Sequence, residues 1–166
     1  MKAVARTVVA APVDTVWNVV SDPERALSFW SGITRWEVES DEPSGLGARY
    51  RILLRIGSAE VGGLVEIVEW SPPTDLAWTS ITGVDQRGRW RLRSTSNGST
   101  QTELRLAAGV AGSGIAGWVA EQIAQPLVAS HLRGTVRQLS RLVEHERMRD
   151  QAAERRAGRL SRPQAG

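Results

Sequence analysis

Three glycines have the spacing of a nucleotide-binding turn. In RLAAGVAGSGIAGWVAEQ, residues 105–122, Gly112, Gly114 and Gly117 form the pattern G-x-G-x-x-G. A dinucleotide site also needs a parallel strand after the helix that follows the motif, with an acidic residue about 20 residues on. Here that helix is the last predicted element, and Arg137 stands about 20 residues beyond the motif. We therefore expect no nucleotide or other cofactor, and interpret the glycines as permitting a sharp turn and a close helix approach.

The titratable residues form no recognisable catalytic or metal-binding pattern. The chain has two histidines, His131 and His145, and no cysteine, so thiolate chemistry is excluded. Both histidines fall on one long predicted helix, too far apart to share a site. Glu66 and Glu69 fall on opposite faces of one predicted strand and form no carboxylate pair. We expect no metal ion and assign no catalytic residue.

A shaped pocket needs only a few polar groups to move protons between positions on a bound molecule. The candidates for that task are Tyr50, Thr79, Ser80, Gln122 and His131. His131 has two interpretations that stay open: an acid or base that points into the interior, or a histidine partly packed at the surface.

The composition describes one ordinary globular domain. The chain has 166 residues, 41% of them hydrophobic and 23% charged, and a net charge of +3. Residues 1–149 are predicted to form a single domain, and the arginine-rich segment 150–166 a flexible basic tail. The N-terminal apolar run is too short for a signal peptide or a membrane span, so we expect a cytoplasmic protein.

Hydrophobic periodicity predicts an α+β fold. A first strand over residues 2–10 precedes two short helices, over residues 11–22 and 22–30, the second with Leu27 and Trp30 on its inner face. Six strands with period-two alternation follow, and Gly62-Gly63 predicts a bulge or a sharp bend in one of them. A long amphipathic helix over about residues 113–149 ends the domain. A curved antiparallel sheet around such a helix can enclose a ligand cavity of about several hundred Å³.

The aromatic residues favour such a cavity. The chain has seven tryptophans but only one phenylalanine and one tyrosine. At least four of the indole rings fall on inward faces by period, where rigid rings either fill a core or line a pocket. Each ring alone is more typical of a core, but for the set we expect some to line a cavity.

Three segments resemble one family. They are APVDTVWNVVSDPERALSFW, VEIVEWSPPTDLAW and QPLVASHLRGTVRQLSRLVE, at residues 11–30, 65–78 and 125–144. In this order they resemble the START/polyketide cyclase-like superfamily (SRPBCC, Bet v 1-like), over residues 3–146. The resemblance implies the helix-grip fold, β-α-α-β6-α, with a curved seven-stranded sheet wrapped around the C-terminal helix. It also implies a hydrophobic cavity for lipids, sterols or polyketides, whereas it leaves activity open, since fold does not settle function.

Three hypotheses for function follow. The first is a protein that binds a lipid, fatty acid, sterol or polyketide in this cavity, without metal or nucleotide. The second is a polyketide aromatase/cyclase or dehydratase. The third is an interaction module for RNA or an anionic membrane, using the basic tail and outward arginines at positions 49, 51, 55, 89, 91 and 93. The ligand-binding residues predicted for the first are Trp30, Tyr50, Leu54, Trp78, Ser80, Trp90, Trp118, Gln122 and His131.

Overall fold

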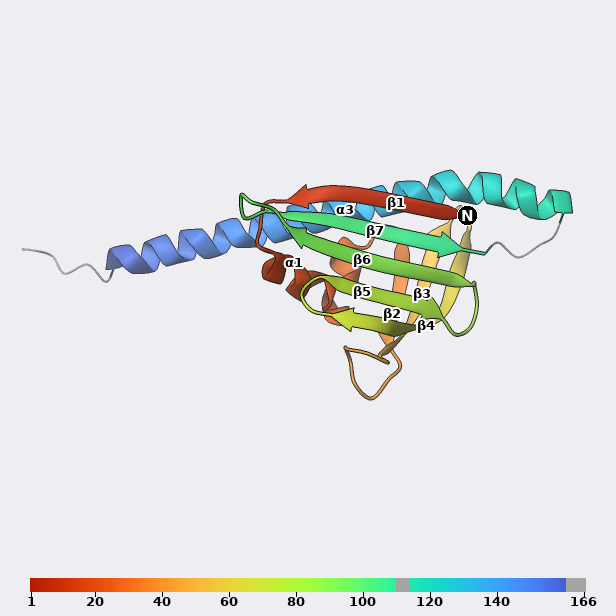
Figure 1. Ribbon diagram of the computed structural model, residues 1–166, viewed down its shortest axis with the longest axis horizontal. Coiled ribbons are helices and arrows are strands. Elements are labelled where there is room, and N and C mark those ends of the chain that lie inside the picture. The colour runs from red at the N-terminus through yellow and green to blue at the C-terminus, as the bar shows by residue number, and fades with distance from the viewer. Residues whose placement is uncertain (110–113, 161–166) are drawn as a thin grey trace, which may run out of the picture.

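One antiparallel sheet and one long helix organise the chain (Figure 1). The computed structural model describes residues 1–109 and 114–160, excluding the side chains of residues 114–123. Seven strands pair in the order β1-β7-β6-β5-β4-β3-β2. They are β1 (Lys2–Val9), β2 (Ile33–Val38), β3 (Arg49–Ile56), β4 (Ala59–Ser71), β5 (Asp75–Ser80), β6 (Gln86–Ser94) and β7 (Thr100–Ala108). The helices are α1 (Val13–Val20), the 3-10 turn η1 (Pro23–Arg25), α2 (Ala26–Phe29) and α3 (Gly114–Leu160). The predicted α+β architecture is confirmed.

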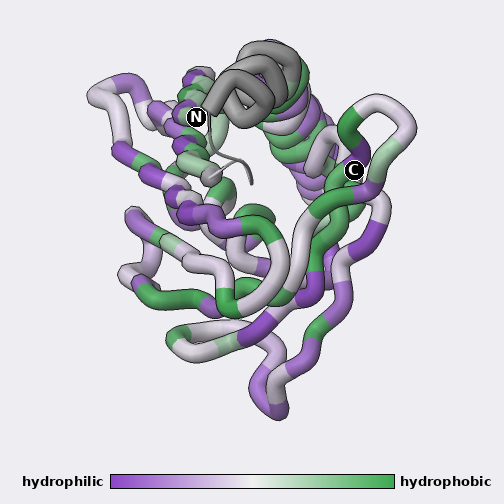
Figure 2. Tube along the Cα trace, turned by 90° about the vertical axis from the view of Figure 1, so that its right-hand side faces the viewer, coloured by the Kyte–Doolittle hydropathy of each residue, from purple (hydrophilic) through white to green (hydrophobic). Residues whose placement is uncertain are grey.

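The sheet curls around its own interior, and α3 closes the open side (Figure 2). The glycine pair in β4 allows this curvature: a Cβ on Gly62 would overlap the carbonyl oxygen of Ile52 in β3, and one on Gly63 that of Thr82. The backbones therefore approach more closely there than any side chain permits. The register shift in β4 lies further along, between Ile67 and Glu69.

The two short helices cover one end of the interior. The apolar stripe of α1 buries Val16 and Trp17 against the sheet. The expected second helix is divided into η1, where Asp22 accepts a hydrogen bond from the backbone nitrogen of Glu24 at 2.9 Å, and the single turn α2. The prediction that Leu27 faces inward is wrong: its side chain is exposed, because this division rotates it away from the core.

Helix α3 crosses the sheet along its whole length and continues beyond it (Figure 1). Its buried residues recur three and four positions apart on one face. They are Val128, Leu132, Thr135, Val136, Leu139 and Val143. The helix continues past the predicted end at Arg149 to Leu160, with residues 150–160 exposed. A separation into a domain over residues 1–149 and a tail stays a prediction. Within the part of the chain that the structure describes, no helix is both long and apolar enough to cross a bilayer.

Candidate functional site

An apolar cavity of about 90 Å³ lies between the sheet and α3. Strands β2 to β7 supply one wall, and α3 supplies the other. The apolar side chains that line it are those of Trp30, Ile33, Trp36, Ile52, Leu54, Ile56, Val61, Trp78, Val84, Leu106, Val128 and Leu132. Ser31, Gln86, His131 and Thr135 add polar groups, so the wall is mostly hydrophobic with a few polar positions, as small-molecule sites are. We call this space the main cavity.

Indole rings explain why the main cavity is smaller than the several hundred Å³ expected. The Trp30 ring lies at the centre of an aromatic cluster, with its centroid 5.6 Å from that of Trp90, 5.8 Å from Trp78 and 6.0 Å from Trp36. These edge-to-face and tilted contacts fill the middle of the interior. A small cavity of about 20 Å³ remains on the far side of the cluster, and Trp30, Trp36 and Trp78 line both spaces.

A histidine joins the helix to the sheet at the wall of the main cavity. The His131 Nε2 atom lies 3.2 Å from the carbonyl oxygen of Arg55, and Nδ1 lies 3.4 Å from the Ser31 Oγ atom. Since a carbonyl can only accept, Nε2 carries the proton and Nδ1 accepts from the serine hydroxyl when the ring is neutral. The ring packs on Gly32, whose φ is +79°, and a Cβ there would lie 2.5 Å from the imidazole. The Ser31 nitrogen also donates to Thr135 Oγ1, at 3.0 Å.

Tyr50 lies across the aromatic cluster from His131, and its hydroxyl proton is engaged in a hydrogen bond. The Tyr50 hydroxyl donates to the carbonyl oxygen of Pro43 at 2.8 Å, while the ring lines the small cavity and contacts Trp36. Burial, together with the negative charge of Asp22, raises the pKa of the Tyr50 phenol to about 12. Tyr50 is therefore neutral at physiological pH, and its hydroxyl holds the loop after β2.

The structure separates the predicted ligand-binding residues into groups. Trp30, Leu54, Trp78 and His131 meet at the main cavity. Tyr50 and Trp90 line the small cavity, together with the Trp30 and Trp78 rings. Ser80 lies at the end of β5, where its Oγ accepts a hydrogen bond from the Gln86 nitrogen at 3.1 Å, and it lines neither space. The side chains of Trp118 and Gln122 lie outside the described residues, and so does Gly112, the first glycine of the G-x-G-x-x-G motif.

Trp36 was not among the predicted binding residues, yet it borders both cavities. Its Nε1 atom is enclosed and has no hydrogen-bond partner among the described residues. The period-two pattern of residues 33–40 does place Trp36 on the inward face, and that signal could have found it.

The outward arginines of the sheet form ion pairs with carboxylates. Arg49 pairs with Glu66 at 2.8 Å and Arg51 with Glu39 at 2.6 Å. The remaining pairs are Arg55–Glu60, Arg89–Glu69, Arg91–Asp75 and Arg93–Asp75. All six strand arginines therefore have acidic partners, with Asp75 shared by two of them, so carboxylates offset most of the positive charge on this part of the proposed interaction surface.

Metal and nucleotide sites would need arrangements that can be checked in residues 1–109 and 114–160. Within these ranges, no three histidine, aspartate or glutamate side chains gather closely enough to hold a metal ion. Every strand pair there is antiparallel, and α3 is the final described element, so these residues contain no strand–helix–strand unit of the nucleotide-binding kind.

Comparison with known proteins gives a family for the chain and relatives with the same fold. Residues 1–144 match the family model "Polyketide cyclase / dehydrase and lipid transport". The chain belongs to this family. The predicted resemblance to the START/polyketide cyclase-like superfamily is thereby confirmed.

Several solved structures share the fold. TTHA0849 from Thermus thermophilus is 20% identical, with a TM-score of 0.76 over 88% of this chain and 99% of its own. The Zhui aromatase/cyclase from a Streptomyces species is 18% identical, with a TM-score of 0.74 over 87% and 93%. A START superfamily protein from Mycobacterium smegmatis is 18% identical, with a TM-score of 0.65 over 87% and 97%. These likenesses confirm the helix-grip fold, and no curated protein matches the chain in sequence.

Proposed function

We propose that this member of the polyketide cyclase/dehydrase and lipid transport family binds an apolar small molecule in the main cavity. The observation that carries the proposal is the cavity itself: a hydrophobic space between sheet and helix, with indole rings on one side and Ser31, His131 and Thr135 on another. The apolar wall would supply affinity, and the few polar groups would orient the ligand.

The size of the cavity limits what enters without rearrangement. An engineered cavity that holds benzene in another protein measures about 150 Å³, and the main cavity measures about 90 Å³. A ligand of the size of benzene would therefore have to shift part of the aromatic cluster, and a sterol or a fatty acid would have to displace more of it. Trp30 is the ring whose movement would open most space, because it borders both cavities and lies against the rings of Trp36, Trp78 and Trp90.

Calorimetric titration with benzene, naphthalene and palmitate tests this proposal. A Leu54→Trp variant would fill the main cavity, whereas Val8→Trp places the same ring on the exposed face of β1, where Val8 is 56% exposed. We expect at least one of the three molecules to bind the wild type and Val8→Trp equally, and Leu54→Trp at least tenfold more weakly. Absence of binding to the wild type by all three, or equal binding by Leu54→Trp, would contradict the proposal.

A second function, that of a polyketide cyclase or dehydratase, is favoured by the His131–Ser31 pair at the cavity wall. A neutral imidazole can take a proton next to a carbonyl and return it to a leaving hydroxyl. Tyr50 is a weaker candidate, because its hydroxyl already donates to Pro43. Turnover of a poly-β-keto mimic that is lost in His131→Gln, with binding retained, would support this function; binding without turnover by the wild type would leave only the first.

A further inference from the structure

The indole nitrogen of Trp36, at the edge of two cavities, is a donor without an acceptor among the described residues. Trp36 lies on β2, an edge strand of the sheet. Its ring packs between those of Tyr50 and Trp30, at centroid distances of 5.3 and 6.0 Å. It borders both the main and the small cavity. In the part of the chain that the structure describes, its Nε1 is the one buried side-chain nitrogen or oxygen that no group accepts from or donates to.

Four of the neighbouring polar side chains already have partners. The Tyr50 hydroxyl is bonded to Pro43, and Ser31, His131 and Thr135 bond to one another and to the Arg55 carbonyl. Buried donors are almost always hydrogen-bonded in folded proteins, so an enclosed indole N–H with no partner among the described residues is suited to an acceptor on a bound molecule. The cavities that Trp36 borders are the space in which such an acceptor can lie.

We propose that the Trp36 N–H binds the carbonyl oxygen of a neutral, otherwise apolar ligand. This inference rests on the proposed binding function. The charged groups at the two cavities favour a neutral ligand at Trp36. No arginine or lysine lines either cavity among the described residues, and the charged amino group of Met1, at the wall of the main cavity, already donates to the Ala108 carbonyl at 2.7 Å. Asp22 lines the small cavity beside Trp36, and its negative charge disfavours a carboxylate there.

A pair of matched probes isolates this hydrogen bond. Acetophenone and α-methylstyrene have nearly the same shape, but the first has a carbonyl oxygen where the second has a CH₂ group. Calorimetry gives the affinity of each probe for the wild type and for Trp36→Phe, which keeps an aromatic ring but loses the N–H. We expect the ratio of ketone affinity to alkene affinity to fall about three- to tenfold in the variant, the range of one net hydrogen bond.

Trp17→Phe is the matched control. Trp17 is also an interior indole, more deeply buried than Trp36, but it packs against Trp70 and lines neither cavity, so its loss should leave the ratio unchanged. The indole N–H resonances of ¹⁵N-labelled protein give an independent readout, and the one missing in Trp36→Phe identifies Trp36. That resonance should move downfield with acetophenone and much less with α-methylstyrene.

The outcomes separate this inference from the proposed function. A ratio that falls in Trp36→Phe alone, with the downfield shift, supports the carbonyl-binding role. Binding of both probes with the same ratio in wild type and variant would overturn that role and leave the apolar cavity as a binding site. Binding of neither probe would overturn this inference, and together with failure of the benzene, naphthalene and palmitate titrations it would overturn the proposed function.

Discussion

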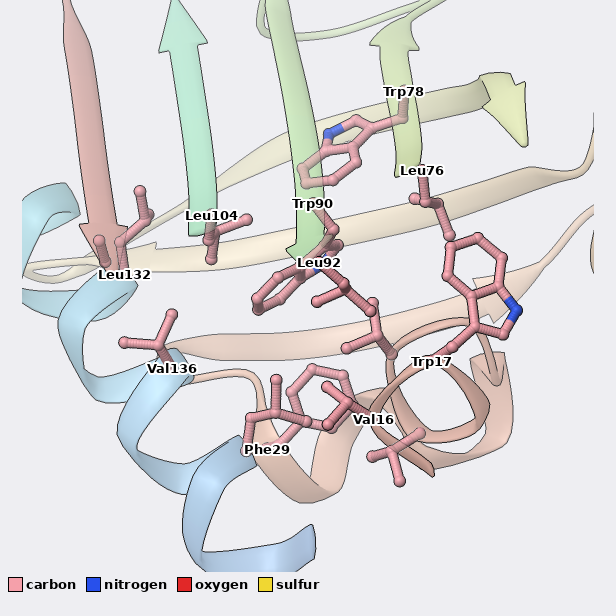
Figure 3. Close-up of a cluster of buried hydrophobic side chains, with 14 of the residues drawn as sticks. Val16, Trp17, Phe29, Leu76, Trp78, Trp90, Leu92, Leu104, Leu132 and Val136 are labelled. Atoms are coloured by element: carbon pink, nitrogen blue, oxygen red, sulfur yellow. The ribbon is translucent and has the colours of Figure 1, made fainter. Parts of the chain in front are cut away.

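The two ends of the space beneath α3 are built differently. At the packed end, defined by Val9, Val16, Leu92, Leu139 and Val143, every side chain is fully buried. Figure 3 shows Val16, Phe29 and Leu92 close together between the short helices and the strands. At the cavity end, defined by Leu54, Trp78 and His131, the same sheet and the same helix leave the main cavity open.

Side-chain shape accounts for the difference. Branched aliphatic residues at the packed end interdigitate at the density typical of protein interiors. At the cavity end, rigid indole rings meet edge to face and cannot fill the angles between them, while Gly32 brings the backbone against His131. The comparison teaches that tight packing and open space lie at opposite ends of one layer, so substitutions should affect stability and the proposed binding separately.

Removing core volume at the packed end should have the largest effect. Leu139→Ala leaves a space where no neighbour can relax, because Leu139 is 0% exposed. We expect the free energy of unfolding to fall by about 2–5 kcal/mol. Urea denaturation measures it. A loss below about 1 kcal/mol would show that the packed end is as loose as the cavity end.

Gly32→Ala should have the next largest effect, and it acts at the cavity end. The positive φ of Gly32 disfavours a side chain, and the new Cβ would displace the His131 ring. We expect a loss of about 1–3 kcal/mol in the free energy of unfolding. The histidine resonances should also move, as the contacts with Ser31 and Arg55 are broken. Unchanged stability and unchanged resonances would contradict the close contact between helix and sheet at this point.

The titration of Tyr50 shows whether the small cavity, which the ring lines, excludes water. The pKa of the phenol is raised in the folded protein, so its contribution to stability is fully present below about pH 10, the unfolded value, and is lost as the pH rises towards 12. Tyr50 is the only tyrosine, so ultraviolet absorbance of the phenolate reports on it alone. We expect a midpoint near 12 in the folded protein. A midpoint near the ordinary value of about 10 would mean that water reaches the ring.

Leu54→Ala should have the smallest effect on stability. Leu54 borders the main cavity, so its truncation enlarges a space that already exists instead of creating one in a packed region. We expect the free energy of unfolding to fall by about 1 kcal/mol or less, well below the loss for Leu139→Ala. Thermal denaturation of both variants side by side gives the comparison, and equal losses would remove the distinction between the two ends.

The fold could be predicted from the sequence because its signals are local. Period-two alternation marked the strands, and the three- and four-residue spacing of apolar residues marked α3. Leu27 was misplaced because a 3-10 turn precedes α2 and changes the rotation of the helix. The site was harder to predict: contact between Ser31 and His131 joins residues 100 positions apart, which periodicity does not report. Likewise, the pattern could place Trp36 inward but not reveal that its N–H lacks an acceptor.

The most direct test of the account is a crystal of the wild-type protein soaked with iodobenzene. The iodine atom scatters anomalously, so its position is found without assumptions about the ligand. We expect a peak inside the protein, between Leu54, Trp78 and His131, with the Trp30 ring moved from its place in the aromatic cluster. An interior without iodine, at a concentration that saturates sites elsewhere on the surface, would contradict the claim that the cavity end is a binding site.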